Sequence, residues 1–406
     1  MILRRYIHKV LSDYYQQPCD KVVGSIQSNS IDFKSLFGEW HWRRVYGQLY
    51  KKQSGQWLTP VELFRPYYSQ ILANYIAEQG RGQKKIDIVE IGGGRGTNAK
   101  YILDHLQHKH SDIYNCDINY TIMDASSTLL ELQRNILFNN TNVEGIKSGG
   151  SQGHHDRILH LKELDMLDVA EKKSIFMEES SVLTIVIANE VLDNLPHDKL
   201  STCSKTGQLM QTNLYKDKDT GTLQESFVPL QDKLLKHMVD IYPPFIPTNG
   251  AKWVPTVAAH LLTQIFEKRY NASVLFADFD YLPPPDILST SSQTRISYRA
   301  EGEPLVTDMN DVDHECYLAS PPLCDILFPT DFHMLNGYVS ATLEETLKNR
   351  GGVVDARPYK VSVKNQRNFL ALYGPEEVEE TKSRWTGYSP LLHDFSNCSI
   401  LSVSRL

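Results

Sequence analysis

The sequence has 406 residues, of which 41% are hydrophobic and 22% charged, and its formal net charge is -7. This length and balance indicate one large globular domain with additions, or two domains, with a core that needs no disulfides. The mild acidity gives no reason to expect a nucleic-acid partner, and no stretch approaches the ~20 apolar residues of a membrane-spanning helix. The six cysteines form no CxxC pair and no zinc-ligand spacing, so we expect reduced thiols and no metal site.

The N-terminal segment is basic and has apolar residues at helical spacing. It runs from Met1 to Leu11 with no acidic residue before Asp13. Two interpretations remain open, namely a mitochondrial presequence over residues 1–20 and an ordinary amphipathic first helix. Residues 21–85 read as a helical N-terminal region, in which the spacing from Pro60 to Gln79 predicts a helix with its proline in the first turn.

From Ile86 onward, short apolar runs alternate with helical spacing. This alternation predicts an α/β fold with a Rossmann-like sheet of parallel strands and helices on both faces. We place the core of this fold in residues 86–280 and its C-terminal part, with a tail, in residues 346–406. The strands are expected over residues 86–91, 120–123, 157–164, 182–188 and 273–277, and helices over 97–108 and 127–138.

Three segments interrupt this alternation. Residues 145–153 contain four glycines and predict a mobile loop. Residues 281–294 contain three consecutive prolines and a Ser/Thr run, and residues 301–315 carry six acids, which we expect to be solvated. We assign residues 281–345 to an inserted accessory region.

A glycine-rich loop follows the first predicted strand, in the order Glu90, Gly92, Gly94, Gly96. Glycines at this place let a ligand approach the backbone, and the free amides of the following helix favour a polar or negative group. In the dinucleotide fingerprint G-x-G-x-x-G the third glycine would fall at Thr97, but here it comes one residue early. The loop is instead similar to the first motif of S-adenosylmethionine methyltransferases.

Acidic residues follow the second and third predicted strands. Asp124 ends the second strand, where a carboxylate can accept hydrogen bonds from both ribose hydroxyls, and its alternative role is a helix N-cap. Asp165 ends the third strand and is a candidate partner for the adenine amino group. We therefore predict cofactor binding by Glu90, the three loop glycines, Asp124 and Asp165.

The fourth predicted strand leads into Ala188–Pro196, which reads A-N-E-V-L-D-N-L-P. Ligands of open α/β sheets bind at the carboxyl ends of the strands, so these polar side chains would face the methyl donor. Asn189, Glu190 and Asp193 are the catalytic candidates, because a carboxylate can hold a cationic nitrogen in line for transfer. In the alternative interpretation Asp193 or Asn194 caps a helix and Glu190 is solvated.

Several segments together resemble the MidA-like methyltransferases. Residues 89–97 (V-E-I-G-G-G-R-G-T) are close to that family's V-E-L-G-A-G-R-G-T, and residues 188–196 are similar to its A-N-E-x-x-D-A-L-P. Residues 124–133 resemble E-V-S-P-x-L-R-x-x-Q, residues 277–281 resemble D-Y-G-Y, and Asp331-Phe332 falls where the family has V-D-F. The sequence departs from the family at Val61, in an altered T-S-P-E, and at Asp280, which replaces a glycine.

The resemblance implies a methyltransferase sheet and S-adenosyl-L-methionine as cofactor. It further implies methylation of an arginine in a protein substrate, a mitochondrial complex I subunit or another respiratory-complex protein, and a location in the mitochondrial matrix. Two other hypotheses are a non-catalytic assembly or scaffold protein on the same fold and a nicotinamide-dependent dehydrogenase. The early third glycine argues against the dehydrogenase.

Overall fold

A computed structural model describes most of the chain. The residues outside the described part are 25, 27–30, 53–57, 139–154, 156–157, 172–174, 179–181, 283–286, 289–294, 297–301, 311, 319–320, 350–357 and 406. The predicted glycine-rich loop over 145–153 and most of 281–294 therefore lie outside the described residues. No helix in the described part is long and apolar enough to cross a bilayer.

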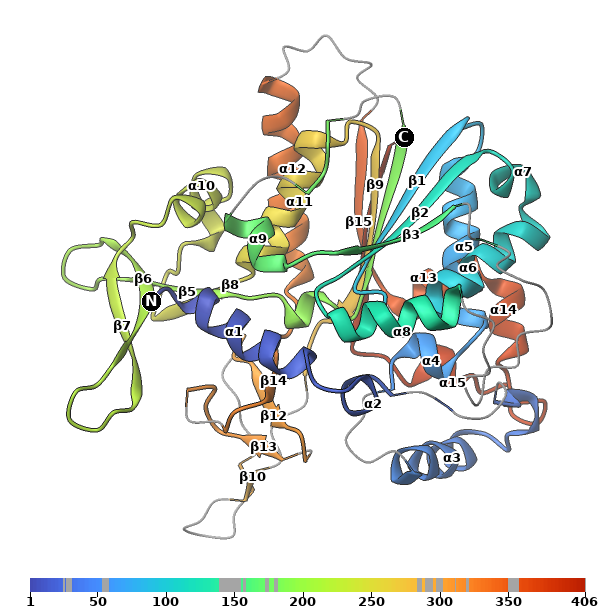
Figure 1. The fold of residues 1–406 in the computed structure, drawn as a ribbon, viewed down its shortest axis with the longest axis horizontal. Helices are drawn as coiled ribbons and strands as arrows, with labels where there is room; N and C mark the ends of the chain where they lie inside the picture. Colours follow the sequence, from blue (N-terminus) through green and yellow to red (C-terminus); the bar gives the residue numbers. More distant parts are fainter. Residues whose placement is uncertain are drawn as a thin grey trace.

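The centre of the fold is a seven-stranded sheet with the order β15-β16-β9-β4-β1-β2-β3 (Figure 1). Strands β3, β2, β1, β4 and β9 are parallel to one another, and β16 is antiparallel to both of its neighbours. The strands are β1 (Lys85–Ile91), β2 (Asp117–Asp124), β3 (Leu159–Glu163), β4 (Leu183–Asn189), β9 (Ala272–Phe279), β15 (Tyr359–Asn365) and β16 (Cys398–Arg405).

Helices cover both faces of this sheet (Figure 1). Helices α5 (Tyr67–Gly80), α6 (Thr97–Lys109) and α13 (Gln366–Tyr373) share one hydrophobic core with it, and α11 (Thr256–Lys268) and α12 (Phe332–Asn349) share the other. The side chains of strand β4 show that both faces of the sheet are buried. Ile185 and Ile187 belong to the first core and Val186 to the second, so both of its faces are buried and its sequence is a continuous apolar run. The predicted α/β class and the five predicted parallel strands are confirmed.

The remaining helices are shorter or peripheral. They are α2 (Cys19–Val22), α3 (Glu39–Lys52), α4 (Pro60–Leu63), α7 (Ser111–Tyr114), α8 (Ser127–Leu137), α9 (Met166–Glu171), α10 (Lys233–Ile241), α14 (Pro375–Glu380) and α15 (Pro390–His393). The single helix predicted from Pro60 to Gln79 is divided into α4 and α5. The division falls at Pro66, because a proline disfavours helical backbone in the residue before it.

Between β4 and β9 the chain forms a second sheet with the order β7-β6-β5-β8. Its antiparallel strands are β5 (Asp198–Thr202), β6 (Leu209–Lys216), β7 (Leu223–Pro229) and β8 (Ala251–Val254). These residues lie inside the segment predicted as the core, and they form a layer beside it.

A smaller sheet, β13-β12-β14, follows β9 and consists of β12 (Leu305–Asp308), β13 (Asp313–His314) and β14 (Cys324–Leu327). β12 and β13 lie within residues 301–315, so only part of the predicted solvated acidic segment is loop. The short strands β10 (Ile287–Leu288) and β11 (Arg295–Ile296) pair with each other in a separate two-stranded antiparallel sheet.

The N-terminal helix α1 (Leu3–Tyr15) packs against the sheets β7-β6-β5-β8 and β13-β12-β14 (Figure 1). Leu3, Ile7 and Leu11 are buried in a cluster with Trp253 and Phe328. The basic, amphipathic segment therefore buries its apolar face within the protein, and the prediction of a presequence over residues 1–20 stays a prediction.

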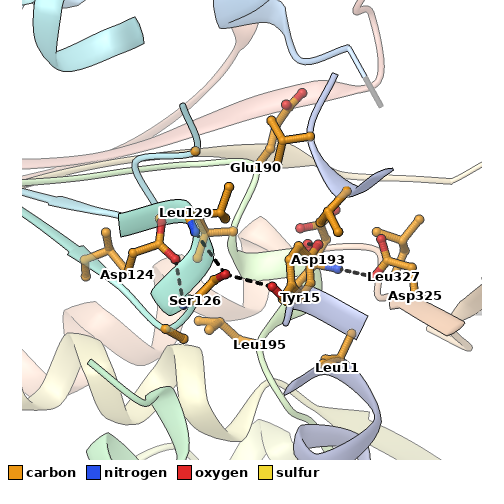
Figure 2. A pocket seen from close by; sticks show the side chains of 18 of the residues that line it. Leu11, Tyr15, Asp124, Ser126, Leu129, Glu190, Asp193, Leu195, Asp325 and Leu327 are labelled. Carbon is orange, nitrogen blue, oxygen red and sulfur yellow. Dashed lines mark hydrogen bonds between the residues drawn. The ribbon is translucent and has the colours of Figure 1, made fainter. Parts of the chain in front are cut away.

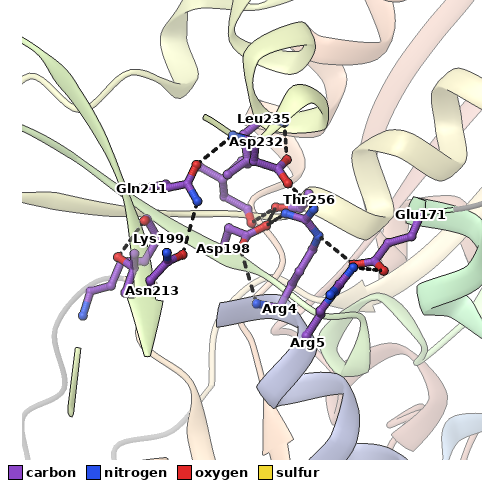
Figure 3. A network of polar contacts seen from close by, with 12 residues as sticks. Arg4, Arg5, Glu171, Asp198, Lys199, Gln211, Asn213, Asp232, Leu235 and Thr256 are labelled. Carbon is purple, nitrogen blue, oxygen red and sulfur yellow. Dashed lines mark hydrogen bonds and ion pairs between the residues drawn. The ribbon is translucent and has the colours of Figure 1, made fainter. Parts of the chain in front are cut away.

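A buried arginine anchors α1 (Figure 3). Arg4 is 3% exposed, and its guanidinium donates to Asp198 Oδ2 at 2.8 Å and to Asp232 Oδ2 at 2.6 Å. Asp198 is itself 1% exposed. The next residue, Arg5, pairs with Glu171 at the surface, with its side chain 57% exposed.

We expect Arg4→Met to destabilise the protein far more than Arg5→Met does. Removing Arg4 leaves the buried carboxylate of Asp198 unpaired, which costs about 3–5 kcal/mol. The exposed pair of Arg5 contributes about 1 kcal/mol or less. Urea unfolding of the two variants at neutral pH measures the difference, and equal losses would show that Arg4 is no anchor.

Candidate functional site

A cavity of about 340 Å³ lies at the carboxyl ends of β1, β2 and β4. This volume is in the range of small-molecule sites. One wall comes from the main sheet, one from α1, and one from β12 and β14 of the accessory region. Figure 2 shows the side chains that surround it.

The glycine loop forms one edge of the cavity. Gly92 donates to Met123 O at 2.8 Å, which ties the loop to β2. Gly94 has a φ of +51°, and a Cβ added to it would meet no atom within 4 Å. Since Gly94 lines the cavity, its missing side chain leaves room for a ligand against the backbone. Gly96 has a φ of +82° at the start of α6 and packs against Leu137 of α8.

Glu90 supports the loop from behind. Its carboxylate accepts hydrogen bonds from Asn98 Nδ2 at 2.8 Å and from the Tyr120 hydroxyl at 2.9 Å. Burial raises the pKa of Glu90 to about 7. The cavity is lined by Gly92 and Gly94, whereas Glu90 lies beneath them and holds the first turn of α6.

Asp124 lines the cavity at the end of β2. Its two carboxylate oxygens accept from Ser126 N and from Gln133 Nε2, each at 3.0 Å, and each oxygen keeps a further lone pair. Burial raises its pKa to about 6. The N-cap of α8 is Ser126, whose hydroxyl accepts from Leu129 N, so the capping alternative does not describe Asp124.

Gln133 is a site residue that the sequence reasoning missed. Its amide nitrogen also donates to Gly94 O at 2.9 Å, so one side chain joins the glycine loop to Asp124. The sequence did contain a signal for this residue, because Gln133 is the last residue of the segment that resembles E-V-S-P-x-L-R-x-x-Q.

Asp165 also lines the cavity, at the end of β3. Its carboxylate accepts from Leu167 N at 2.7 Å and lies 3.2 Å from Nε2 of His8 in α1. The hydrogen bond from His8 helps to lower the pKa of Asp165, although burial acts in the opposite direction. The residue predicted to hold adenine is therefore already in contact with the N-terminal helix.

The three catalytic candidates follow one another at the end of β4. Asn189 closes the strand, Glu190 has a φ of +52°, and Asp193 lies in the 3-10 turn Leu192–Asn194. Left-handed backbone in a non-glycine residue is uncommon and is often found at functional sites. Each of the three has a buried polar atom without a hydrogen-bond partner. These atoms are Oδ1 and Nδ2 of Asn189, Oε1 of Glu190 and Oδ1 of Asp193.

The two carboxylates point in different directions. Figure 2 shows the Glu190 carboxyl directed away from Asp193, whereas Asp193 lies with Tyr15 of α1 and Asp325 of β14. Burial raises the pKa of Asp193 well above its usual value, and the charges of Asp278, Asp325 and Glu190 raise it further. The turn after β4 thus separates the carboxyl groups of Glu190 and Asp193, and Asp193 belongs to a cluster of acids with Asp278 and Asp325.

A second residue that sequence reasoning missed, Asp278 at the end of β9, holds this turn. Its Oδ2 accepts from the backbone N–H groups of Val191, Leu192 and Asp193 at 3.1, 2.7 and 3.1 Å. Its Oδ1 accepts from Phe279 N. The local signal was an acid directly after an apolar strand.

The departures from the family pattern leave this geometry in place. Glu62, next to Val61, is buried and accepts from the hydroxyl of Thr97 and from Arg65, so the segment still joins α4 to α6. Asp280 accepts from Ser399 Oγ at 2.6 Å.

Comparison with known proteins agrees with this arrangement. The profile of a family described as "Putative S-adenosyl-L-methionine-dependent methyltransferase" matches residues 69–349. The chain belongs to this MidA-like family. No curated protein matches the sequence.

Two solved structures share the fold, both COG1565 superfamily proteins from Burkholderia thailandensis. One, bound to S-adenosyl-homocysteine, is 16% identical with a TM-score of 0.61, and the alignment covers 100% of this chain and 88% of that one. The other is a native structure, 15% identical with a TM-score of 0.58, covering 100% and 87%.

S-adenosylmethionine is the cofactor of this methyltransferase, and the residues present fit it. The open space at Gly94 accepts a ligand close to the loop backbone, and Asp124 offers two oxygens to ribose hydroxyls. The orphaned amide of Asn189 offers a donor and an acceptor beside them.

The glycine cradle can be tested with Gly94→Ala. The new methyl group would enter the space beside the loop, so we expect the affinity for S-adenosylmethionine to fall by about tenfold or more. Gly207→Ala is the matched control, because Gly207 also has a positive φ (+69°) and no atom within 4 Å of an added Cβ. Calorimetric titration of both variants separates backbone strain from ligand exclusion, and equal affinities would contradict the cradle.

Asp124→Asn should lower the affinity for S-adenosylmethionine by about one to two orders of magnitude, because it replaces charge-assisted hydrogen bonds. Glu90→Gln, a change of the same kind beneath the loop, should leave the affinity within about threefold of wild type. The same titration measures both, and a larger effect at Glu90 would mean that it, rather than Asp124, contacts the cofactor.

Proposed function

We propose that this methyltransferase modifies a guanidinium nitrogen of an arginine in a protein substrate. The observation that carries the proposal is the acid cluster at the end of β4. Asp193 and Asp325 are 3% and 2% exposed, both line the cavity, and Asp193 Oδ1 has no hydrogen-bond partner. Buried carboxylates need a cation or hydrogen-bond donors, and the planar guanidinium supplies both.

In the proposed reaction the glycine loop and Asp124 bind the cofactor, and Asp193 orients the acceptor. The bound cofactor supplies a methyl group on a positively charged sulfur, which leaves as a neutral thioether. The acceptor nitrogen forms the new bond with its electron pair and loses one proton to Asp193 Oδ1. The product guanidinium keeps a single positive charge, and Asp193 later releases the proton to water.

This division of labour agrees with the physical demands of the reaction. The donor is already activated, so most of the rate enhancement comes from placing the acceptor in line and excluding water. Burial raises the pKa of Asp193 well above its usual value. The positive acceptor beside Asp193 would favour its charged form, and a charged carboxylate in such a buried place takes up a proton more readily than an exposed one.

The resemblance further supports a mitochondrial respiratory-complex subunit as substrate and the mitochondrial matrix as location. The basic residues of the N-terminal segment are in keeping with this location, although Arg4 also serves the fold by pairing with Asp198 and Asp232.

Transfer of radiolabelled methyl from S-adenosylmethionine into a mitochondrial protein extract tests the proposal, with the labelled residue mapped by mass spectrometry. We expect label on arginine. We expect Asp193→Asn to reduce transfer by about tenfold or more, through loss of a charge-assisted hydrogen bond and of the proton acceptor. Glu190→Gln, tested in parallel, measures the part played by the second carboxylate.

Asp219→Asn is the control, since Asp219 lies exposed in the turn between β6 and β7. Label on another residue type or on a small molecule would change the acceptor. A folded protein with no transfer would favour the non-catalytic scaffold, and full activity in Asp193→Asn would remove the catalytic assignment.

A further inference from the structure

The accessory region contributes an acid to the cavity of the main sheet. Asp325 lies in β14, pairs with Thr307 of β12, and is 2% exposed. Leu305 and Leu327 of the same small sheet line the cavity beside it. Phe328 N donates to Asp193 O at 2.8 Å, so the end of β14 is joined to the turn that carries Asp193.

Neutral groups hold Asp325 in place. Asn194 Nδ2 donates to Asp325 Oδ1 at 2.9 Å, and the Tyr15 hydroxyl lies close enough to help lower the pKa of Asp325. The same hydroxyl donates to Asn194 Oδ1 at 2.8 Å. Tyr15, Asn194 and Asp325 come from α1, the turn after β4 and β14, so three distant parts of the chain fix this carboxyl group.

The electrostatics of the cluster favour a bound cation. Burial raises the pKa of Asp325 to about 7, and the groups that lower it are the Ile326 amide, Tyr15 and Asn194, all neutral. Asp325 in turn raises the pKa of Asp193. Two buried acids that repel each other are relieved when a positive group enters between them.

We propose that Asp325 and Asp193 together form the binding site for the cationic acceptor group, with Tyr15 as a positioning residue. The inference rests on the proposed function and extends it, since it assigns acceptor recognition to the accessory region. Leu305 and Leu327 would pack against the aliphatic part of a long cationic side chain.

Asp325→Asn tests the proposal, because the amide keeps the size of the side chain and removes its charge. The measurements are initial rates of methyl transfer into the mitochondrial extract at increasing extract concentration, and calorimetric titration of S-adenosylmethionine. We expect the half-saturating extract concentration to rise about tenfold or more, with cofactor affinity within about threefold of wild type. Glu315→Gln, an exposed acid of the same accessory region, is the control and should behave as wild type.

Tyr15→Phe is the second variant. It removes one hydroxyl from the triangle and should raise the half-saturating concentration by a smaller factor, with little change in the maximal rate. A merely structural role would instead lower thermal stability and leave the half-saturating concentration unchanged. This variant keeps the test decisive if Asp325→Asn does not fold.

The outcomes are distinguishable from those of the proposed function. No transfer by the wild-type protein contradicts the proposed function and, with it, the inference. Wild-type transfer with an unchanged half-saturating concentration in both variants overturns the inference alone. A loss of cofactor affinity in Asp325→Asn also overturns it, because Asp325 would then belong to the cofactor site.

Discussion

The carboxylate of Asp278 holds the turn after β4, which places Asp193 at one end of the cavity. Three consecutive backbone N–H groups after β4 point to one of its oxygens, and a buried turn cannot leave such groups without partners. The position of Asp278 follows from the sheet, since β9 runs parallel to β4 and ends beside it. The turn held by Asp278 begins directly after Glu190, whose backbone is left-handed, and includes Asp193.

Asp278 is one of several acids that are buried together at this end of the cavity. Asp278 is compensated by backbone amides, although burial still raises its pKa to about 7. Asp193 keeps an oxygen without a partner, and Asp325 has only neutral ones. The pKa values of Asp193 and Asp325 are therefore raised in the free protein, and a cation that enters beside them would favour their charged forms. Under the proposed function, the guanidinium of the acceptor would supply this positive charge.

The sequence predicted the main sheet well because burial on both faces leaves apolar runs. β1, β2, β4 and β9 lie within a few residues of their predicted bounds. The antiparallel sheet β5–β8 was missed because its strands, such as β7, are partly exposed and carry no such run. The glycine loop and Asp124 follow strand ends and were predictable locally. Tyr15 and Asp325 were not, since they meet Asn194 only through long-range folding, and no local pattern marks them.

This contrast reflects how the cavity is built. The cofactor end depends on the parallel sheet, whose strand ends carry recognisable motifs. The end of the cavity to which we assign the acceptor is built from α1, β14 and the turn after β4, which lie far apart in the sequence. Arg4 ties the start of α1 to Asp198 of β5, and Tyr15 ties its end to the turn after β4. The same helix also reaches the cofactor end, because His8 contacts Asp165 and the carbonyl of Tyr15 accepts from the hydroxyl of Ser126, beside Asp124. Helix α1 therefore couples the two ends of the cavity, so a change in its packing would be felt at both.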